Sequence, residues 1–393
     1  MKNKIVTDIS IVGGGLTGSI IALSLAQYGI KSYIIEKNNN HIMLNTNYDT
    51  RTTALAPSSK DLLSSINIWE LLKKDIGFIN EIRVSDGDTP IFLHFDKHDI
   101  GNKPLGFMIK NSILRLKLHS AILNDKHVKL ISPATIENMS ITNDKAVLSL
   151  NNGTEIISDL IIGADGKRSS IRDMSNINTI GWNYNQTAII TNIKHDLSHN
   201  NIAHERFLKS GPLAILPLKN SFSSSIVWTE STDNAPSFLA LNKKDFKNEL
   251  TNRMGSFLGK IEVYEKRYSY PLMLKIAKNY ISDRVVLIGD AAHTIHPIAG
   301  QGLNLGIRDI KTLTKILANT KKYGLDLGTK SVLTEYQKIR RSENLLMGVT
   351  TDFLNNLFSN DVLPVKLIRD LGLNFVNNLS SLKREFIYHA IGK

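Results

Sequence analysis

The chain has 393 residues, which is enough for one large domain or two closely connected ones with an ample core. Hydrophobic residues make up 42% of it and charged residues 21%, which excludes a disordered chain; the lack of cysteine excludes disulfides, thiolate metal ligands and a cysteine nucleophile. The formal charge of +12 would attract nucleic acid, anionic lipid or an anionic cofactor. Because the basic residues are scattered and not interleaved with an aromatic stripe, the sequence favours lipid or cofactor over nucleic acid.

The first predicted elements lie in an apolar stretch, residues 9–30, that carries no charge. It is long enough to span a bilayer and follows two lysines, so a transmembrane helix and a secretory signal are two alternatives. The stretch contains GGGLTG at residues 13–18, preceded by a β-branched run and followed by a helical apolar pattern and a second buried strand at 32–35. The order strand, tight turn, helix, strand predicts a dinucleotide-binding unit, with a purely structural Gly-rich turn as the third alternative.

Each glycine of this turn has a predicted role. Gly13 permits the sharp turn, Gly15 lets the backbone approach a pyrophosphate, and Gly18 lets helix and strand pack closely. The free N–H groups at the helix start, around Leu16 and Thr17, would meet the phosphate charge.

Carboxylates stand at the ends of the other predicted strands. Glu36 ends the second strand beside Lys37, and its carboxylate can accept hydrogen bonds from both hydroxyls of an adenosine ribose. Farther along, two buried strands lead into Gly163-Ala164-Asp165-Gly166 and Gly289-Asp290. The strand ends at Gly13, at Gly163-Ala164-Asp165-Gly166 and at Gly289-Asp290 each carry Gly or Asp, and all three can converge on one extended ligand.

These motifs resemble, in order and spacing, those of the FAD-dependent aromatic hydroxylases, the single-component flavoprotein monooxygenases. The three that carry the resemblance are GGGLTG with Glu36, GADGKRSSIR at 163–172 and GDAAHTIHPIAGQGLNLGIRD at 289–309. Other segments are similar to the branch that hydroxylates polyprenyl phenols in ubiquinone biosynthesis: DTRTTAL at 49–55, GFMIKN at 106–111, AHERF at 203–207, GPLAILP at 211–217, and LKR at 382–384 before AIG at 390–392. The resemblance runs from residue 8 to the last residue.

The resemblance implies an α/β fold with a FAD-binding Rossmann-like domain of the para-hydroxybenzoate-hydroxylase type, an interleaved β-sheet substrate domain and a helical C-terminal region. Short apolar strands alternate with polar turns between residues 187 and 230, and residues 263–270 add another strand, which suits that sheet. The expected FAD-binding parts are residues 1–84, 106–180 and 276–325. The expected substrate-domain parts are 85–105 and 181–275, and the helical region is 326–393.

The resemblance also implies roles for residues that follow the strands. Arg51 would reach the FAD pyrophosphate from the second side, with a solvated surface arginine as the alternative. Asn111 would touch the ribityl chain, although Leu116 stands where relatives often carry a polar residue. Asp165 would serve FAD and the reduced nicotinamide, against a simple strand-end turn, and Asp290 would bond the ribityl hydroxyls.

The loop that begins at Pro297 is expected to bring main chain beside the isoalloxazine, with Gly300 and Gly302 as its flavin-facing positions. The following helix would direct the N–H groups of Gly302, Leu303 and Asn304 at the pyrimidine edge. A helix N-terminus carries about half a positive charge, which favours an anionic reduced flavin.

By the same resemblance, NADH or NADPH would reduce FAD, and one oxygen atom of O2 would pass to a ring carbon beside a phenolic oxygen. Only one G-x-G-x-x-G occurs, so no separate nicotinamide-binding domain is expected. His293 and His296 are interpreted as packing or loop-bonding residues rather than general bases, and no metal site is expected. The group that activates the phenol is not assigned.

A polyprenyl phenol is a lipid, so the expected location is cytoplasmic, with peripheral contact at the inner face of the cytoplasmic membrane. The chain from Lys311 onward carries 13 basic and 7 acidic residues. A predicted helical stripe there comprises Val332, Tyr336, Ile339, Leu346, Val349, Phe353 and Leu357. A basic amphipathic face binds anionic lipid; packing on the FAD domain and binding of other ubiquinone-biosynthesis proteins are the alternatives.

Two other classes of function remain open at this point. One is a FAD-dependent reductase or halogenase on the same scaffold, although Trp228 lacks the W-x-W-x-I-P context of halogenases. The other is a non-enzymatic protein that binds prenyl groups, which the intact third motif disfavours.

Overall fold

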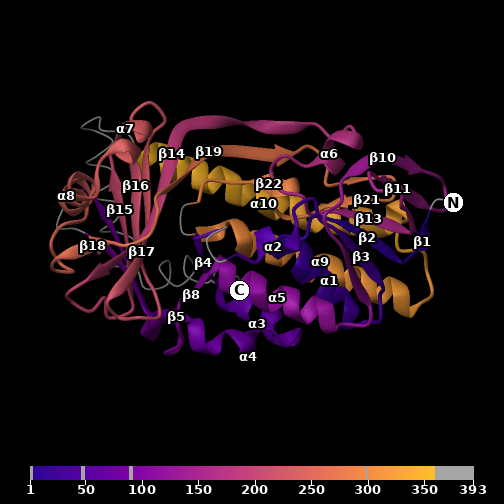
Figure 1. Ribbon diagram of the computed structural model, residues 1–393, viewed down its shortest axis with the longest axis horizontal. Coiled ribbons are helices and arrows are strands. Elements are labelled where there is room, and N and C mark those ends of the chain that lie inside the picture. Colours follow the sequence, from indigo (N-terminus) through magenta and orange to yellow (C-terminus); the bar gives the residue numbers. More distant parts are fainter. Residues whose placement is uncertain (1–2, 46–48, 88–91, 298–299, 359–393) are drawn as a thin grey trace.

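The computed structural model describes residues 3–45, 49–87, 92–297 and 300–358. Two parts lie side by side, one built on a mainly parallel sheet and one on a large, mainly antiparallel sheet (Figure 1). Two long paired strands, β14 (Thr179–His195) and β19 (Tyr268–Ala277), extend from the large sheet toward the other part. The α/β class predicted from the sequence is confirmed.

The parallel sheet holds the strands of all three sequence motifs. Its order is β20 (Ile281–Ser282), β21 (Val285–Leu287), β13 (Leu160–Gly163), β2 (Ile9–Val12), β3 (Ser32–Ile35) and β9 (Val128–Ile131), and only β20 is antiparallel. Every residue of β2, β13 and β21 is buried, as expected for strands covered on both faces. Helices α1 (Leu16–Ala26), α5 (Asn111–Asn124) and α9 (Gln301–Lys322) pack together beside it.

The charge-free stretch at 9–30 is therefore a strand, a turn and a helix rather than one long helix. Nine of the eleven residues of α1 are buried. Across the described part of the chain, no helix combines the length and apolar character needed to cross a bilayer.

Two smaller sheets flank the parallel one. The first contains β1 (Lys4–Val6), β12 (Glu155–Ser158), β11 (Ala146–Leu150) and β10 (Ile136–Ile141), and the second contains β4 (Thr52–Leu55), β8 (Gly106–Lys110) and β5 (Gly77–Ile79). The short helices are α2 (Asn40–Met43), α3 (Pro57–Ser65), α4 (Trp69–Leu72), α6 (Ser170–Met174), η1 (Lys73–Asp75), η2 (Lys97–Ile100) and η3 (Gly289–Ala291).

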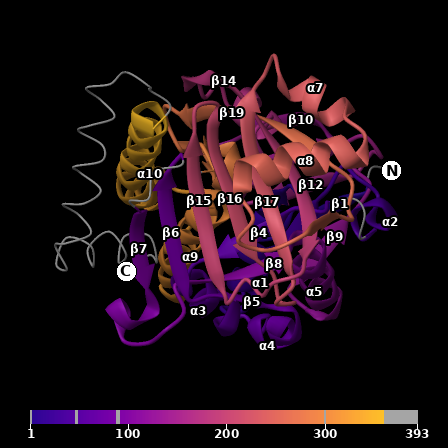
Figure 2. The same ribbon diagram turned by 90° about the vertical axis from the view of Figure 1, so that its left-hand side faces the viewer.

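The large sheet matches the sheet predicted from the alternation in the middle of the chain. Its path is β22 (His293–Thr294), β19, β14, β17 (Ser223–Ser231), β16 (Gly211–Pro217), β15 (Ile202–Leu208), β6 (Glu81–Asp86) and β7 (Phe92–Asp96), and β18 (Ile261–Val263) also pairs with β14. On its outer face α7 (Ala235–Ala240) and α8 (Lys243–Met254) cover a core around Trp228 (Figure 2). The sheet includes β6, which begins before the expected boundary at residue 85. The predicted domain boundaries stay a prediction.

Helix α10 (Lys330–Phe358) closes the described chain, and the predicted motif at 382–384 lies outside the described residues. Its predicted apolar stripe divides between two environments. Tyr336 is buried in the core, whereas Leu346, Val349 and Phe353 are exposed. In that second half the buried positions are small or polar: Asn344, Gly348, Thr351 and Asn355.

Candidate functional site

The three motifs meet at one edge of the parallel sheet. Strands β2, β13 and β21 are neighbours and parallel, so their carboxyl ends emerge together. A Cβ placed on Gly13 would lie 2.4 Å from the carbonyl oxygen of Ala164, and one on Gly289 would lie 3.0 Å from Cγ2 of Thr17. The convergence predicted from the sequence is therefore present.

Of the four glycines in the loop, Gly15 has open space around it, and the other three are closely packed. Gly13 has φ +107°, which favours glycine, and a Cβ on Gly18 would lie 1.9 Å from the carbonyl oxygen of Gly13. A Cβ on Gly15 would meet nothing within 4 Å. Gly15 is also the N-cap of α1, which begins at Leu16 and has no side-chain cap. This cradle fits a pyrophosphate, because main-chain N–H groups at a helix start are available to it.

Glu36 lies beside this loop. The side chain is buried; its Oε2 accepts a hydrogen bond from Gly14 N at 2.7 Å and its Oε1 accepts one from Asn38 N at 2.8 Å. These two bonds fix the carboxylate at the end of β3. The side chain of Lys37 is exposed.

A second charged group surrounds Asp49 in front of β4. Arg51 donates from Nε and Nη2 to the two carboxylate oxygens at 2.8 Å each, Arg115 donates at 3.0 Å, and Asn111 donates from Nδ2 at 3.3 Å. Burial opposes ionisation of Asp49, but Arg51 and Arg115 outweigh it and lower its pKa to about 2. The Arg51 guanidinium also lies 4.9 Å from the Tyr270 ring centroid. Sequence reasoning missed Arg115, whose only signal is its position one helical turn after Asn111.

The two aspartates at the strand ends differ in what they contact. Asp165 Oδ2 accepts hydrogen bonds from Ser170 N at 2.7 Å and Ser170 Oγ at 3.0 Å, whereas its buried Oδ1 has no partner in the described chain. Asp290 has an accessible side chain, yet the protein packed around it raises the pKa of its carboxyl, and His293 and Arg51 oppose that rise. Both carboxyls thus retain oxygens that a ligand can bond.

The predicted flavin-facing loop leads into α9. Gly300 has φ +63°, is the N-cap of α9, and donates from N to the carbonyl oxygen of Pro297 at 2.9 Å. Residues 298–299, between them, lie outside the described residues. A Cβ on Gly302 would meet nothing within 4 Å, and Leu303 is partly buried against the core.

Asn304 connects α9 to the segment after β4. Its Oδ1 accepts hydrogen bonds from Ala56 N at 2.9 Å and Ser59 Oγ at 2.7 Å, and its Nδ2 donates to the carbonyl oxygen of Ala54 at 2.8 Å. The amide is thus engaged within the protein, which leaves main chain as the part of Asn304 that can face a cofactor.

A buried ionic cluster joins the two ends of the third motif to α10. Asp309 Oδ2 is 2.6 Å from His293 Nε2 and accepts a hydrogen bond from Gly289 N at 3.0 Å, while Oδ1 accepts one from Arg340 Nε at 2.8 Å. His296 is also buried, with Nε2 3.2 Å from Gln186 Oε1, and burial lowers its pKa to about 4. Both histidines make the loop-bonding contacts expected of them. Sequence reasoning missed Asp309 and Arg340, because nothing local joins α9 to α10.

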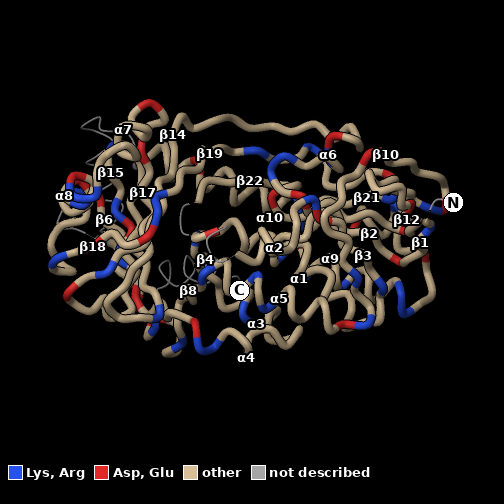
Figure 3. Tube along the Cα trace, viewed as in Figure 1, with Lys and Arg blue, Asp and Glu red and all other residues tan. Residues whose placement is uncertain are grey.

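The inner face of the large sheet lies against the elements that carry the three sequence motifs, which together are called the motif site. Thr52 Oγ1 on β4 donates to Ser225 Oγ on β17 at 2.8 Å, and Lys110 Nζ pairs with Glu265 at 2.8 Å. The sheet is therefore the opposite wall of the motif site. Lysines and arginines alternate with acidic residues over both parts, and no single basic stripe stands out (Figure 3).

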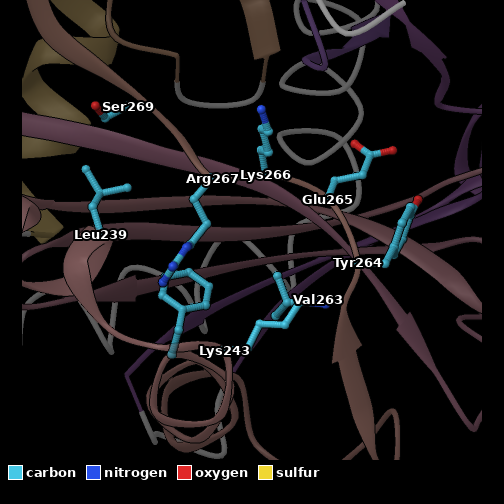
Figure 4. Close-up of a pocket in the computed structure, with 9 residues that line it drawn as sticks. Leu239, Lys243, Val263, Tyr264, Glu265, Lys266, Arg267 and Ser269 are labelled. Atoms are coloured by element: carbon cyan, nitrogen blue, oxygen red, sulfur yellow. The ribbon is translucent and has the colours of Figure 1, made fainter.

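Two other features lie away from this site. A cavity of about 520 Å³ is lined by residues 263–267, Ser269, Leu239, Lys243 and Phe246, beside α8 (Figure 4). In the described chain Glu81, His94 and Asp96 could together hold a metal ion, but Arg83 Nε already pairs with Glu81.

Comparisons with known proteins agree with this geometry. A family model described as FAD binding domain matches residues 6–81 and 136–343. The ubiquinone hydroxylase UbiL of Rhodospirillum rubrum is 40% identical over 387 residues, covering 98% of this chain and 90% of that protein. The 3-demethoxyubiquinol 3-hydroxylase of Escherichia coli is 31% identical and covers 98% of both chains.

Solved structures share the fold at low identity. The p-nitrophenol 4-monooxygenase PnpA of Pseudomonas putida superposes with a TM-score of 0.81 at 18% identity, covering 99% of this chain and 98% of that one. PqsL of Pseudomonas aeruginosa, a probable FAD-dependent monooxygenase, gives 0.78 at 19% identity, covering 94% of this chain and 100% of that one.

Proposed function

Since this chain belongs to the FAD-dependent aromatic hydroxylases of ubiquinone biosynthesis, we propose that it hydroxylates the ring of a polyprenyl phenol, using NAD(P)H and O2. The observation that carries the proposal is the meeting of the three motifs at one sheet edge, opposite the inner face of the large sheet.

The proposed cofactor site uses each strand end for one part of FAD. Gly15 and the start of α1 would hold the pyrophosphate, with Arg51 as its second contact, and Glu36 would hold the adenosine ribose. Asp290 and Asn111 serve the ribityl chain. The other proposed cofactor contacts are Gly13, Leu16, Thr17, Gly18, Lys37, Asp165, Gly302, Leu303 and Asn304.

When bound, FAD supplies the hydride acceptance and oxygen activation that no side chain provides. The protein supplies position and a dry site. The start of α9 places main-chain N–H groups and partial positive charge beside Pro297 and Gly300, where negative charge is stabilised. The inner face of the large sheet holds the aromatic ring against that loop and excludes water.

The lipid nature of this substrate calls for contact with a membrane surface, and α10 offers the apolar face for it. Phe353 is 61% exposed, Leu346 63% and Val349 56%, whereas the fully buried positions described in that half of the helix, Asn344, Gly348, Thr351 and Asn355, are small or polar. An apolar face left outward on a helix whose polar side is buried indicates that something other than this core contacts it. We place peripheral contact with the inner face of the cytoplasmic membrane there.

The test is direct. The purified full chain should show a flavin absorption band, and a short-chain polyprenyl phenol should accelerate NAD(P)H oxidation with oxygen uptake and yield a hydroxylated ring. Flavin-dependent NAD(P)H oxidation that never yields hydroxylated product from any such phenol would contradict the proposal and favour a reductase.

A further inference from the structure

The inner face of the large sheet carries a row of paired residues that crosses seven strands. From β7 to β19 the paired positions are Leu93, Val84, Glu205, Ala214, Val227, Ile190 and Tyr268. Glu205 is the only charged residue among them. A single carboxyl in an apolar wall needs an explanation, because burying an unpaired charge is costly.

The row faces the part of the molecule that is built on the parallel sheet and holds the proposed cofactor site. On β15, side chains alternate, and Ala203, two residues before Glu205, packs with Met108 of β8 and Leu105. On β17, Ser225 contacts Thr52, and the next residue on the same face is Val227 of the row. Strands lie about 4.8 Å apart, so Glu205 sits about 10 Å from Val227, two strands away.

The described residues that pack on the row do not cover it completely. All of its members except Ala214 keep partly accessible side chains, although they lie on the inner face. The two residues flanking Glu205 on the same face of β15, Ala203 and Phe207, are buried. The accessible surface of the row is therefore available to a ligand held between the sheet and the elements of the cofactor site.

The carboxyl of Glu205 has no hydrogen bond or ion pair within the described chain. The protein around it raises its pKa to about 7, with burial as the sole cause. The nearest titratable group on the same face is Asp86 of β6, opposite Phe207, and the row ends at Tyr268. On α10, which packs against β16, Asp352 interacts with Tyr184.

We propose that Glu205 is the catalytic residue that takes the proton from the phenolic hydroxyl of the aromatic substrate. The O–H bond breaks, the proton passes to a carboxylate oxygen, and the electron pair stays on the phenolic oxygen. The total charge of the site stays at minus one, while the ring becomes more electron-rich at the neighbouring carbon. The inference rests on the proposed function, because it requires a phenol as substrate.

A role as the base accounts both for the raised pKa of the Glu205 carboxyl and for its position in an apolar wall. A carboxylate with a raised pKa is a stronger base than an ordinary glutamate, and with a pKa of about 7 roughly half of it is ionised at neutral pH and most of it above that. Its apolar neighbours leave it without a partner among the described residues, so a phenolic hydroxyl of the substrate would be a hydrogen-bond donor for it.

The test compares Glu205→Gln with Glu205→Asp and with Glu262→Gln, a control at an exposed position on β18. Holoenzyme of each variant is first checked for thermal stability and flavin content. We expect Glu205→Gln to lower hydroxylated product about 100-fold or more while NAD(P)H oxidation continues with release of hydrogen peroxide, and Glu205→Asp to restore part of the product. The control should behave like the wild type. The yield of hydroxylated product from the wild type should decrease as the pH is lowered below about 7, and Glu205→Gln should not show this decrease.

A second readout needs no turnover. A nitrated phenol with a short prenyl chain reports its own ionisation by its colour when bound to the oxidised holoenzyme. Two acids that share one proton titrate as a coupled pair, so the bound phenol should titrate differently in the wild type and in Glu205→Gln. Identical titrations together with unchanged product yield in Glu205→Gln would overturn the inference. A wild type that hydroxylates no polyprenyl phenol would instead overturn the proposed function.

Discussion

Asp309 Oδ2 lies 2.6 Å from Nε2 of His293, and neither side chain is more than 1% exposed. The same carboxylate oxygen receives the N–H of Gly289, the residue before Asp290, and the other oxygen receives Arg340 of α10. One buried carboxylate thus holds the third motif to two helices.

Replacing this carboxylate should damage both stability and cofactor retention. Asp309→Asn leaves Arg340 without its buried counter-charge, so we expect a loss of about 3 kcal/mol in the free energy of unfolding. Urea denaturation and the ratio of flavin to protein measure the two effects. The matched control is Glu343→Gln, which removes the exposed partner of the same Arg340 and should cost under about 1 kcal/mol.

The same residue predicts a response to acid. Burial works against the charge on Asp309, but His293 and Arg340 lower its pKa from 3.8 to about 2 in the folded protein. A lowered pKa in the folded state adds stability above the unfolded value, and this contribution disappears as the pH falls from about 4 to about 2. The difference in unfolding free energy between wild type and Asp309→Asn should therefore shrink across that window. A constant difference would show that the charge is not responsible.

Adding one methyl group at each of two glycines in the same loop should have different effects, on FAD binding at one position and on stability at the other. A Cβ on Gly15 meets open space at an ordinary φ, so Gly15→Ala should fold with the stability of the apoprotein unchanged but retain FAD poorly. A Cβ on Gly18 would lie 1.9 Å from a carbonyl oxygen, so Gly18→Ala should lose about 3 kcal/mol or more in unfolding free energy. Thermal melts without flavin, combined with FAD titration, separate the two outcomes. Normal FAD affinity in Gly15→Ala would argue against a pyrophosphate at this position.

The exposed face of α10 predicts binding to lipid. The double variant Val349→Ser with Phe353→Ser removes two side chains that are 56% and 61% exposed, so vesicle binding should fall severalfold without loss of stability. Sedimentation of the full chain with vesicles containing anionic lipid measures it. The control is Leu123→Ser, which changes a residue that is 65% exposed on α5. Equal binding by both variants would remove α10 from the membrane contact.

The raised pKa of Glu205 predicts a pH dependence of the free energy of unfolding, which can be measured without any catalytic assay. Its pKa rises from 4.5 to about 7 on folding, so between these values the folded protein keeps a proton that the unfolded chain has released. Stability therefore falls as the pH rises through this window, by about 1 to 3 kcal/mol. Glu205→Gln should be more stable than the wild type at pH 8, and this advantage should vanish near pH 4. Equal stability at pH 8 would show that the carboxyl is well solvated.

The sequence alone determined the features that depend on neighbouring residues. GGGLTG between two apolar strands, with Glu36 at the second strand end, specifies a turn and a helix start, because backbone angles and the space around a Cβ are local constraints. The parallel order of these strands placed Gly13, Asp165 and Asp290 at one edge. The succession of short apolar strands and polar turns between residues 187 and 230 likewise predicted a β-sheet there.

Only the tertiary structure decided which distant side chains meet. Asp309 joins Arg340, and Asp49 joins Arg115, across 31 and 66 residues, and no periodic pattern encodes such pairs. Helical spacing identified the apolar residues of α10 but not which side of that helix would be buried, because the neighbouring surface selects that side. The same holds for Glu205: alternation on β15 gives it a face, and only the packing of the sheet against the cofactor-site elements shows that the face turns inward.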